Sequence, residues 1–79
     1  MSRIGQKDKQ RLLVLLREVR AQAGMRQEDL ATKLGRPQSF VSRYESGERR
    51  LDLLELCVIC HAVGISLSEF VRRFEEHNR

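Results

Sequence analysis

The sequence predicts an all-α protein, a single domain of five short helices. Its 79 residues include one proline and five glycines, and the runs of β-branched residues that strands favour are sparse. Apolar residues instead recur at intervals of three and four, which is the spacing of one helix face. A chain of this length has room for only one hydrophobic core, so we expect one domain.

The first helix is expected over residues 9–23. Apolar side chains recur there at helical spacing, and Gly24 follows at the position where a left-handed backbone, easiest for glycine, ends a helix. Residues 1–8 lack this periodicity, and we interpret them as a flexible N-terminal arm. The folded domain is therefore placed at residues 9–77.

Two shorter helices are expected next. The second spans about residues 27–34, with Glu28 and Asp29 in its first turn, where carboxylates interact favourably with the helix dipole. The third spans residues 37–46 and begins at Pro37, because proline suits the first helical position. A glycine follows each of the two helices and ends it.

Two similar signals start the last two helices. Residues 52–55 and residues 66–69 each resemble a capping box, in which the N-cap side chain and the side chain three residues later bond to each other's backbone. The fourth helix then reaches Val63, where another glycine follows. The fifth helix frays near His77.

Charge and hydropathy narrow the class of protein. Fifteen Lys and Arg residues against eleven Asp and Glu give a net charge of +4, which suits a polyanionic partner. The longest apolar runs, such as residues 12–16, are far shorter than the ~20 residues of a membrane span. The polar N-terminus does not resemble a signal peptide. We therefore expect a cytoplasmic protein whose two cysteines are reduced.

Residues 27–46 carry the pattern of a helix-turn-helix. Two short helices joined by a tight turn at Gly35 must cross closely, and Ala31 is small enough to permit that approach. The third helix is then left with an outward face of hydrogen-bonding side chains, which suit base edges in the major groove. This outward face consists of Gln38, Ser39, Ser42 and Arg43.

From about Leu12 to Phe74, the chain resembles the Xre/Cro-type, phage-repressor-like helix-turn-helix regulators. The segments that carry the resemblance are residues 16–20, 27–31, 35–47 and 62–67. The resemblance implies a compact, repressor-like DNA-binding domain whose second and third helices form the helix-turn-helix. It also implies a homodimeric transcriptional repressor that binds double-stranded DNA at a palindromic operator.

The resemblance also suggests roles for individual residues. The expected base contacts are Gln38, Ser39 and Arg43. The expected phosphate contacts are Gln27, Arg26, Arg36, Ser42, Arg49 and Arg50. Arg20 and Glu45 match a buried ion pair between the first helix and the end of the third, the alternative being two solvated charges. For Arg36, Arg49 and Arg50, the alternative is an ordinary cluster of solvated charges.

Two positions depart from the family pattern. Arg26 stands where the family usually has a Ser or Thr cap, so the second helix loses a cap worth ~1 kcal/mol. Arg36 stands where an apolar residue is common, so we expect a more exposed turn.

Residues 57–61 read Cys-Val-Ile-Cys-His and match the motif of covalent haem attachment. The two cysteines also raise the alternatives of a zinc site and of thiol redox chemistry. The motif lies inside an amphipathic helix, without the second ligand pair of a structural zinc site or the strand setting of a redox motif. We therefore interpret both cysteines as core residues and expect no cofactor or metal. With His61 and His77 as the only histidines, no catalytic constellation can be assembled, so we expect no enzyme.

The fifth helix carries an apolar stripe that suggests association. Val71 and Phe74 are the expected dimer contacts, the alternative being that the whole stripe closes the monomer core. A two-fold axis would place two recognition helices about 34 Å apart, one turn of the duplex. The alternative function is an antitoxin-type or other interaction module, which binds a partner protein and uses the same DNA face for autoregulation. An activator and a restriction-modification controller fit the same residues.

Overall fold

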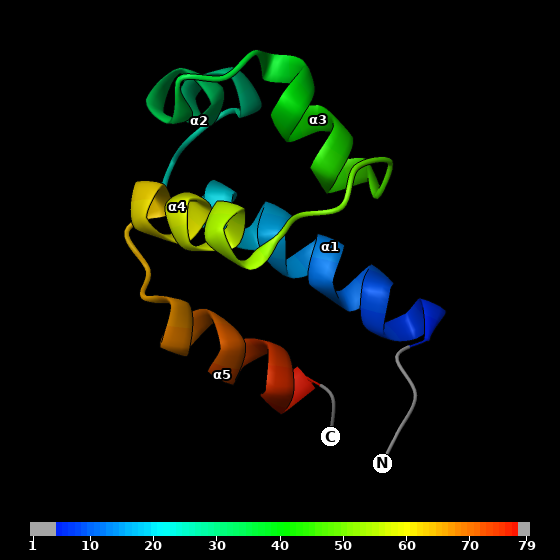
Figure 1. The fold of residues 1–79 in the computed structure, drawn as a ribbon. Coiled ribbons are helices and arrows are strands. Elements are labelled where there is room, and N and C mark those ends of the chain that lie inside the picture. The colour runs from blue at the N-terminus through cyan, green and yellow to red at the C-terminus, as the bar shows by residue number, and fades with distance from the viewer. Residues whose placement is uncertain (1–4, 78–79) are drawn as a thin grey trace.

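The computed structural model describes residues 5–77, which form five helices and no strand (Figure 1). The helices are α1 (Gln6–Gln22), α2 (Gln27–Leu34), α3 (Gln38–Ser46), α4 (Leu53–Val63) and α5 (Leu67–His77). The short α2 and α3 lie together on one side of α1 and α4, and α5 lies on the other side. The all-α, five-helix prediction is confirmed.

Helix α1 begins three residues before the predicted start, so residues 6–8 belong to the helix and not to an arm. The reason is a local cap: the backbone N–H of Gly5 donates to the carboxylate of Asp8 at 3.0 Å, and Arg11 pairs with the same carboxylate. Residues 1–4 of the expected arm lie outside the described residues. Helix α3 begins one residue later than predicted, because Pro37 is its extended N-cap.

The core receives buried side chains from every helix. The most deeply buried large apolar residues are Leu16, Leu30, Val41, Tyr44, Ile59 and Phe70. Ala31 is also buried, as the close crossing of α2 and α3 requires. The turn between these two helices depends on Gly35, whose φ of +68° lets the following N–H return to the carbonyl of Ala31 at 2.9 Å.

The two cysteines of α4 differ in burial. Cys60 is buried in the core and Cys57 is half-buried, and burial raises the pKa of the Cys60 thiol. The prediction that both cysteines are core residues is therefore confirmed for Cys60 and wrong for Cys57, which is not part of the buried core. Among the side chains that the structure describes, those of residues 5–76, no group of three or more His, Cys, Asp or Glu is placed to hold a metal ion.

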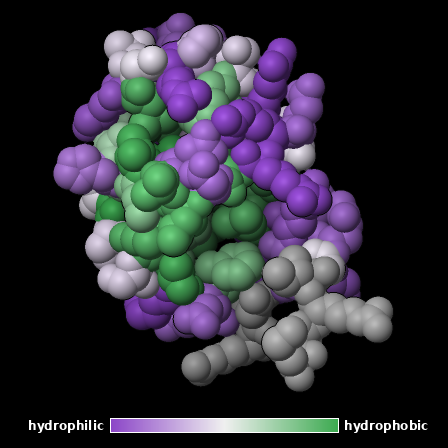
Figure 2. Space-filling model, viewed as in Figure 1, coloured by the Kyte–Doolittle hydropathy of each residue, from purple (hydrophilic) through white to green (hydrophobic). Residues whose placement is uncertain are grey.

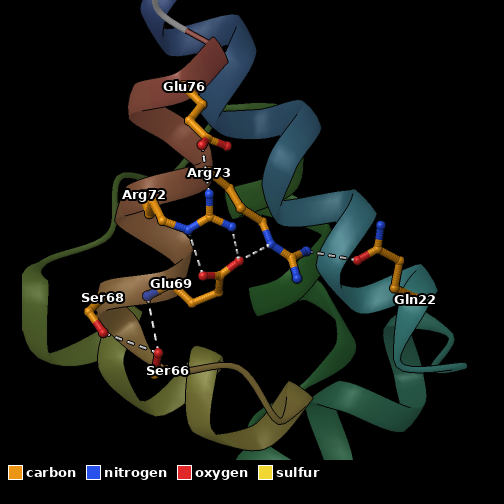
Figure 3. A network of polar contacts seen from close by, with 7 residues as sticks. All are labelled: Gln22, Ser66, Ser68, Glu69, Arg72, Arg73 and Glu76. Atoms are coloured by element: carbon orange, nitrogen blue, oxygen red, sulfur yellow. Dashed lines mark hydrogen bonds and ion pairs between the residues drawn. The ribbon is translucent and has the colours of Figure 1, made fainter.

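A network of polar contacts on the surface attaches helix α5 to α1 (Figure 3), and Phe70 of α5 is buried in the core. Ser66 caps the helix by accepting the N–H of Glu69 at 3.0 Å. The Glu69 carboxylate accepts from Arg72 and Arg73, and Arg73 also donates to Gln22 of α1 at 3.0 Å. These bonds, first the one from Arg72, lower the pKa of Glu69 to about 2.

None of the five described helices is by itself long and apolar enough to cross a membrane. Only α4 and α5 taken together reach that length and composition, with a bend of 100° between them.

Candidate nucleic-acid interface

Helix α3 separates its residues cleanly into two faces. Gln38, Ser39, Ser42 and Arg43 are all exposed, as the sequence predicts. The opposite face is buried and consists of Phe40, Val41, Tyr44 and Glu45. Among residues 5–77 the guanidinium of Arg43 makes no hydrogen bond or ion pair, so its donors are free to bind a ligand. The polar face is thus held outward by the packing of the apolar one.

A buried ion pair fixes the end of α3 against α1. Arg20 Nε donates to Glu45 Oε2 at 2.7 Å, and Arg20 Nη2 donates to Glu45 Oε1 at 3.0 Å. The Glu45 side chain is only 2% exposed, whereas that of Arg20 is 17% exposed. Arg20 also donates to the carbonyl of Met25 at 2.9 Å. The bond to Glu45 raises the pKa of Arg20, so Arg20 stays charged at neutral pH.

Gln27 connects this ion pair to the outer face of α3. Its Nε2 donates to Glu45 Oε1 at 3.1 Å, and its Oε1 accepts a longer contact of 3.5 Å from Gln38 Nε2. The head of α2 is thereby joined to the first turn of α3 through polar side chains. Gln27 consequently has a fixed orientation beside the exposed face.

The start of α2 lacks a Ser or Thr cap, as the sequence predicts, and is stabilised by other bonds. Arg26 contributes no side-chain cap, but its N–H donates to the carboxylate of Asp29 at 2.9 Å. The Arg26 guanidinium contacts the same carboxylate and lies 2.8 Å from Glu28. The bonds from Arg26 lower the pKa of Asp29. Part of the lost capping is therefore replaced, and Arg26 is engaged with its own helix.

Two of the expected phosphate contacts are organised into one cluster. The guanidinium carbons of Arg36 and Arg49 lie 4.6 and 4.8 Å from the ring centroid of Phe40. Arg49 also donates to both carboxylate oxygens of Glu55, at 3.1 and 2.8 Å. Arg50 is exposed and its side chain has no partner among residues 5–77. Phe40 and Glu55 are not among the site residues predicted from the sequence, which suggests no role for Phe40 and only a capping role for Glu55.

Two short crossing helices, the second with a polar and cationic outer face, define a helix-turn-helix domain. A family model described as helix-turn-helix (HTH_3) matches residues 16–70. The chain therefore belongs to the XRE-type helix-turn-helix family, and the resemblance found in the sequence is confirmed. It is a DNA-binding protein of the transcription-regulator class.

Similar solved structures support the same assignment. An XRE-family-like protein from Pseudomonas syringae pv. tomato is 42% identical, with a TM-score of 0.84, and the match covers 92% of this chain and 89% of that one. The clp gene regulator ClgR from C. glutamicum is 25% identical, with a TM-score of 0.76 and coverage of 87% and 88%. A mutant of the restriction-modification controller protein C.Esp1396I shares the fold, at 24% identity, a TM-score of 0.81 and 94% of each chain. The search of curated proteins gives no match.

Proposed function

We propose that this protein is a sequence-specific repressor that reads double-stranded DNA by placing α3 in the major groove. The observation that carries the proposal is the exposed polar face of α3, held in place by the Arg20–Glu45 pair behind it. Gln38, Ser39 and Arg43 contact base edges in this proposal, because amide, hydroxyl and guanidinium groups match the donors and acceptors exposed there.

The residues around this face contact the phosphates. They are Gln27, Arg26, Arg36, Ser42, Arg49 and Arg50. Arg50 is the least constrained of the arginines, whereas Arg26 and Arg49 must bind phosphate while they keep, or exchange, their carboxylate partners. Phosphate contacts of this kind set the register of the protein on the duplex but carry no sequence information.

Arg43→Ala and Arg50→Ala should weaken DNA binding in different ways. We expect Arg43→Ala to lose about 1–3 kcal/mol of discrimination, because an outward arginine can donate two bonds to guanine O6 and N7. Arg50→Ala should weaken binding to all DNA sequences alike. It should also reduce the slope of log affinity against log salt concentration by about one unit for each phosphate that is no longer bound. The measurement compares affinities for a duplex that the wild-type protein selects from a random-sequence library and for a scrambled duplex.

Arg50→Ala serves as the matched control for Arg43→Ala, since each variant removes one exposed arginine. A variant that is merely destabilised loses both affinities in proportion, so circular dichroism must show that each one is folded. Equal losses on the two duplexes for a folded Arg43→Ala protein would contradict base contact by Arg43. Failure of the wild-type protein to enrich any sequence would contradict sequence-specific binding altogether.

The proposed regulator is a homodimer that associates through one apolar surface of α4 and α5. Figure 2 shows apolar side chains gathered over these helices. Leu54 is 76% exposed, Val58 56% and Val71 40%. Apolar side chains that are exposed singly need no explanation, but a group of them suggests an interaction site. Phe74, the other expected contact, is half-buried and lines a neighbouring hollow of about 540 Å³. We therefore define the dimer surface as Leu54, Val58 and Val71, with Phe74 at its edge.

Val58→Asp should convert the dimer into a monomer, because association would bury an unpaired carboxylate. Sedimentation equilibrium of the variant and the wild-type protein provides the measurement. Ala21→Asp is the control, since it adds the same charge at an exposed position of α1. A wild-type protein that is monomeric at tens of micromolar concentration, or a Val58→Asp protein that remains dimeric, would contradict this dimer surface.

We place the protein in the cytoplasm, at the nucleoid, where its DNA partner lies. Its proposed action is binding alone, without catalytic chemistry or a cofactor. Occupation of an operator by the dimer then represses transcription.

A further inference from the structure

Two arginines that flank α3 in the sequence meet over one aromatic ring. Arg36 belongs to the turn before α3 and Arg49 to the loop after it, yet both guanidinium groups lie within 5 Å of the centroid of Phe40. Glu55 of α4 completes the cluster. Its carboxylate accepts two bonds from Arg49, and its Oε2 is 4.0 Å from Arg36 Nη2.

The carboxylate of this cluster is more deeply buried than its two guanidinium groups. The side chain of Glu55 is 18% exposed, whereas those of Arg36 and Arg49 are 49% and 38% exposed. Hydrogen bonds to Glu55, chiefly those from Arg49, lower the pKa of Glu55 to about 2, so Glu55 is an anion at neutral pH. Arg49 turns its two Nη atoms toward Glu55, and among residues 5–77 its Nε and the guanidinium nitrogens of Arg36 have no hydrogen-bond acceptor.

We infer that Glu55 and Phe40 are positioning residues, which hold Arg36 and Arg49 side by side as one preformed binding pair for the DNA phosphates. This inference rests on the proposed function and adds the two residues that organise its backbone contacts. A free arginine loses rotamer freedom when it binds phosphate, and a stacked, carboxylate-paired arginine has already lost it. Because one arginine precedes α3 and the other follows it, the pair fixes how α3 lies against the backbone.

Positioning and simple electrostatics predict opposite results when Glu55 loses its charge. If Glu55 only neutralises Arg49, then Glu55→Gln removes a negative charge near the DNA and tightens binding. If Glu55 positions the arginines, the same substitution weakens binding although the net charge near the DNA becomes more positive. Glutamine also serves at the third position of a capping box, so Glu55→Gln preserves the bond to the N–H of Asp52 that starts α4.

The experiment measures dissociation constants at several salt concentrations for a duplex that the wild-type protein selects from a random library. We expect Glu55→Gln to bind about tenfold more weakly, the fold-change that corresponds to one charge-assisted hydrogen bond. Its salt slope should be shallower by about one unit for each phosphate that the variant no longer binds. In an Arg49→Ala background, Glu55→Gln should have a smaller effect, because the arginine that makes both hydrogen bonds to Glu55 is gone and only the 4.0 Å contact with Arg36 is left.

Glu69→Gln is the matched control. It removes a carboxylate that likewise lies within ion-pair distance of two arginines, but on α5 (Figure 3), and it should leave affinity unchanged or slightly increased. Arg49→Lys provides a second test, because it keeps the charge but cannot form the bidentate pair; it should weaken binding as Glu55→Gln does. Thermal melts establish that each variant is folded.

Tighter or unchanged binding by a folded Glu55→Gln protein would overturn the inference, as would an undiminished effect in the Arg49→Ala background. Either result, with normal wild-type binding, leaves the proposed function intact. If the wild-type protein binds no duplex, both the proposed function and this inference fail.

Discussion

Arg20→Ala should lower the free energy of unfolding by about 3–5 kcal/mol, the usual cost of removing one partner from a buried ion pair. The substitution leaves the carboxylate of Glu45, which is 2% exposed, without either arginine bond. Only the bond from Gln27 remains to compensate it. Since domains of this size are stable by ~5–15 kcal/mol in total, a loss of that size should be evident in a urea unfolding curve.

The opposite substitution, Glu45→Ala, should cost less. Arg20 is 17% exposed and keeps its bond to the carbonyl of Met25, so its charge is less isolated. An Arg20→Met, Glu45→Leu double variant should recover much of the stability, because no charge is then stranded. A loss below about 1 kcal/mol for Arg20→Ala, the range of exposed ion pairs, would contradict a structural role for this pair.

The helices could be predicted from local signals because their ends depend on neighbouring residues. Left-handed glycines after α2, α3 and α4 end those helices where the sequence indicates. The start of α1 could not be predicted from periodicity, since Gly5 and Asp8 form a cap ahead of the first apolar repeat. Local polar bonds of this kind extend a helix without any hydrophobic pattern.

The outer face of α3 was also predictable, because helical geometry places every residue of a short helix once its buried side is known. The cluster around Phe40 was not. It joins residues from a turn, a helix, a loop and a second helix, and stacking of arginine on an aromatic ring has no characteristic sequence spacing. The resemblance suggested Arg36 and Arg49 as phosphate contacts, but the carboxylate and ring that orient them depend on tertiary packing.

The exposed face of α4 was missed for a related reason. Cys60 is predicted as a core residue and is buried, as is Ile59 beside it in the sequence. Leu54 and Val58 lie on the other side of the same helix and remain exposed. A helix that is apolar on more than one side indicates a second packing partner, but only the fold shows which side the core already covers.

The salt dependence of DNA binding tests the central claim most directly. A dimer that makes roughly 6–10 phosphate contacts releases that many sets of counterions, so its affinity should fall ~10³- to 10⁵-fold between about 50 and 200 mM salt. The measurement is a fluorescence-anisotropy titration of the wild-type protein with its selected duplex across that range. A steep linear fall of log affinity with log salt is the predicted result, and a flat response, or no binding at low salt, would contradict the account.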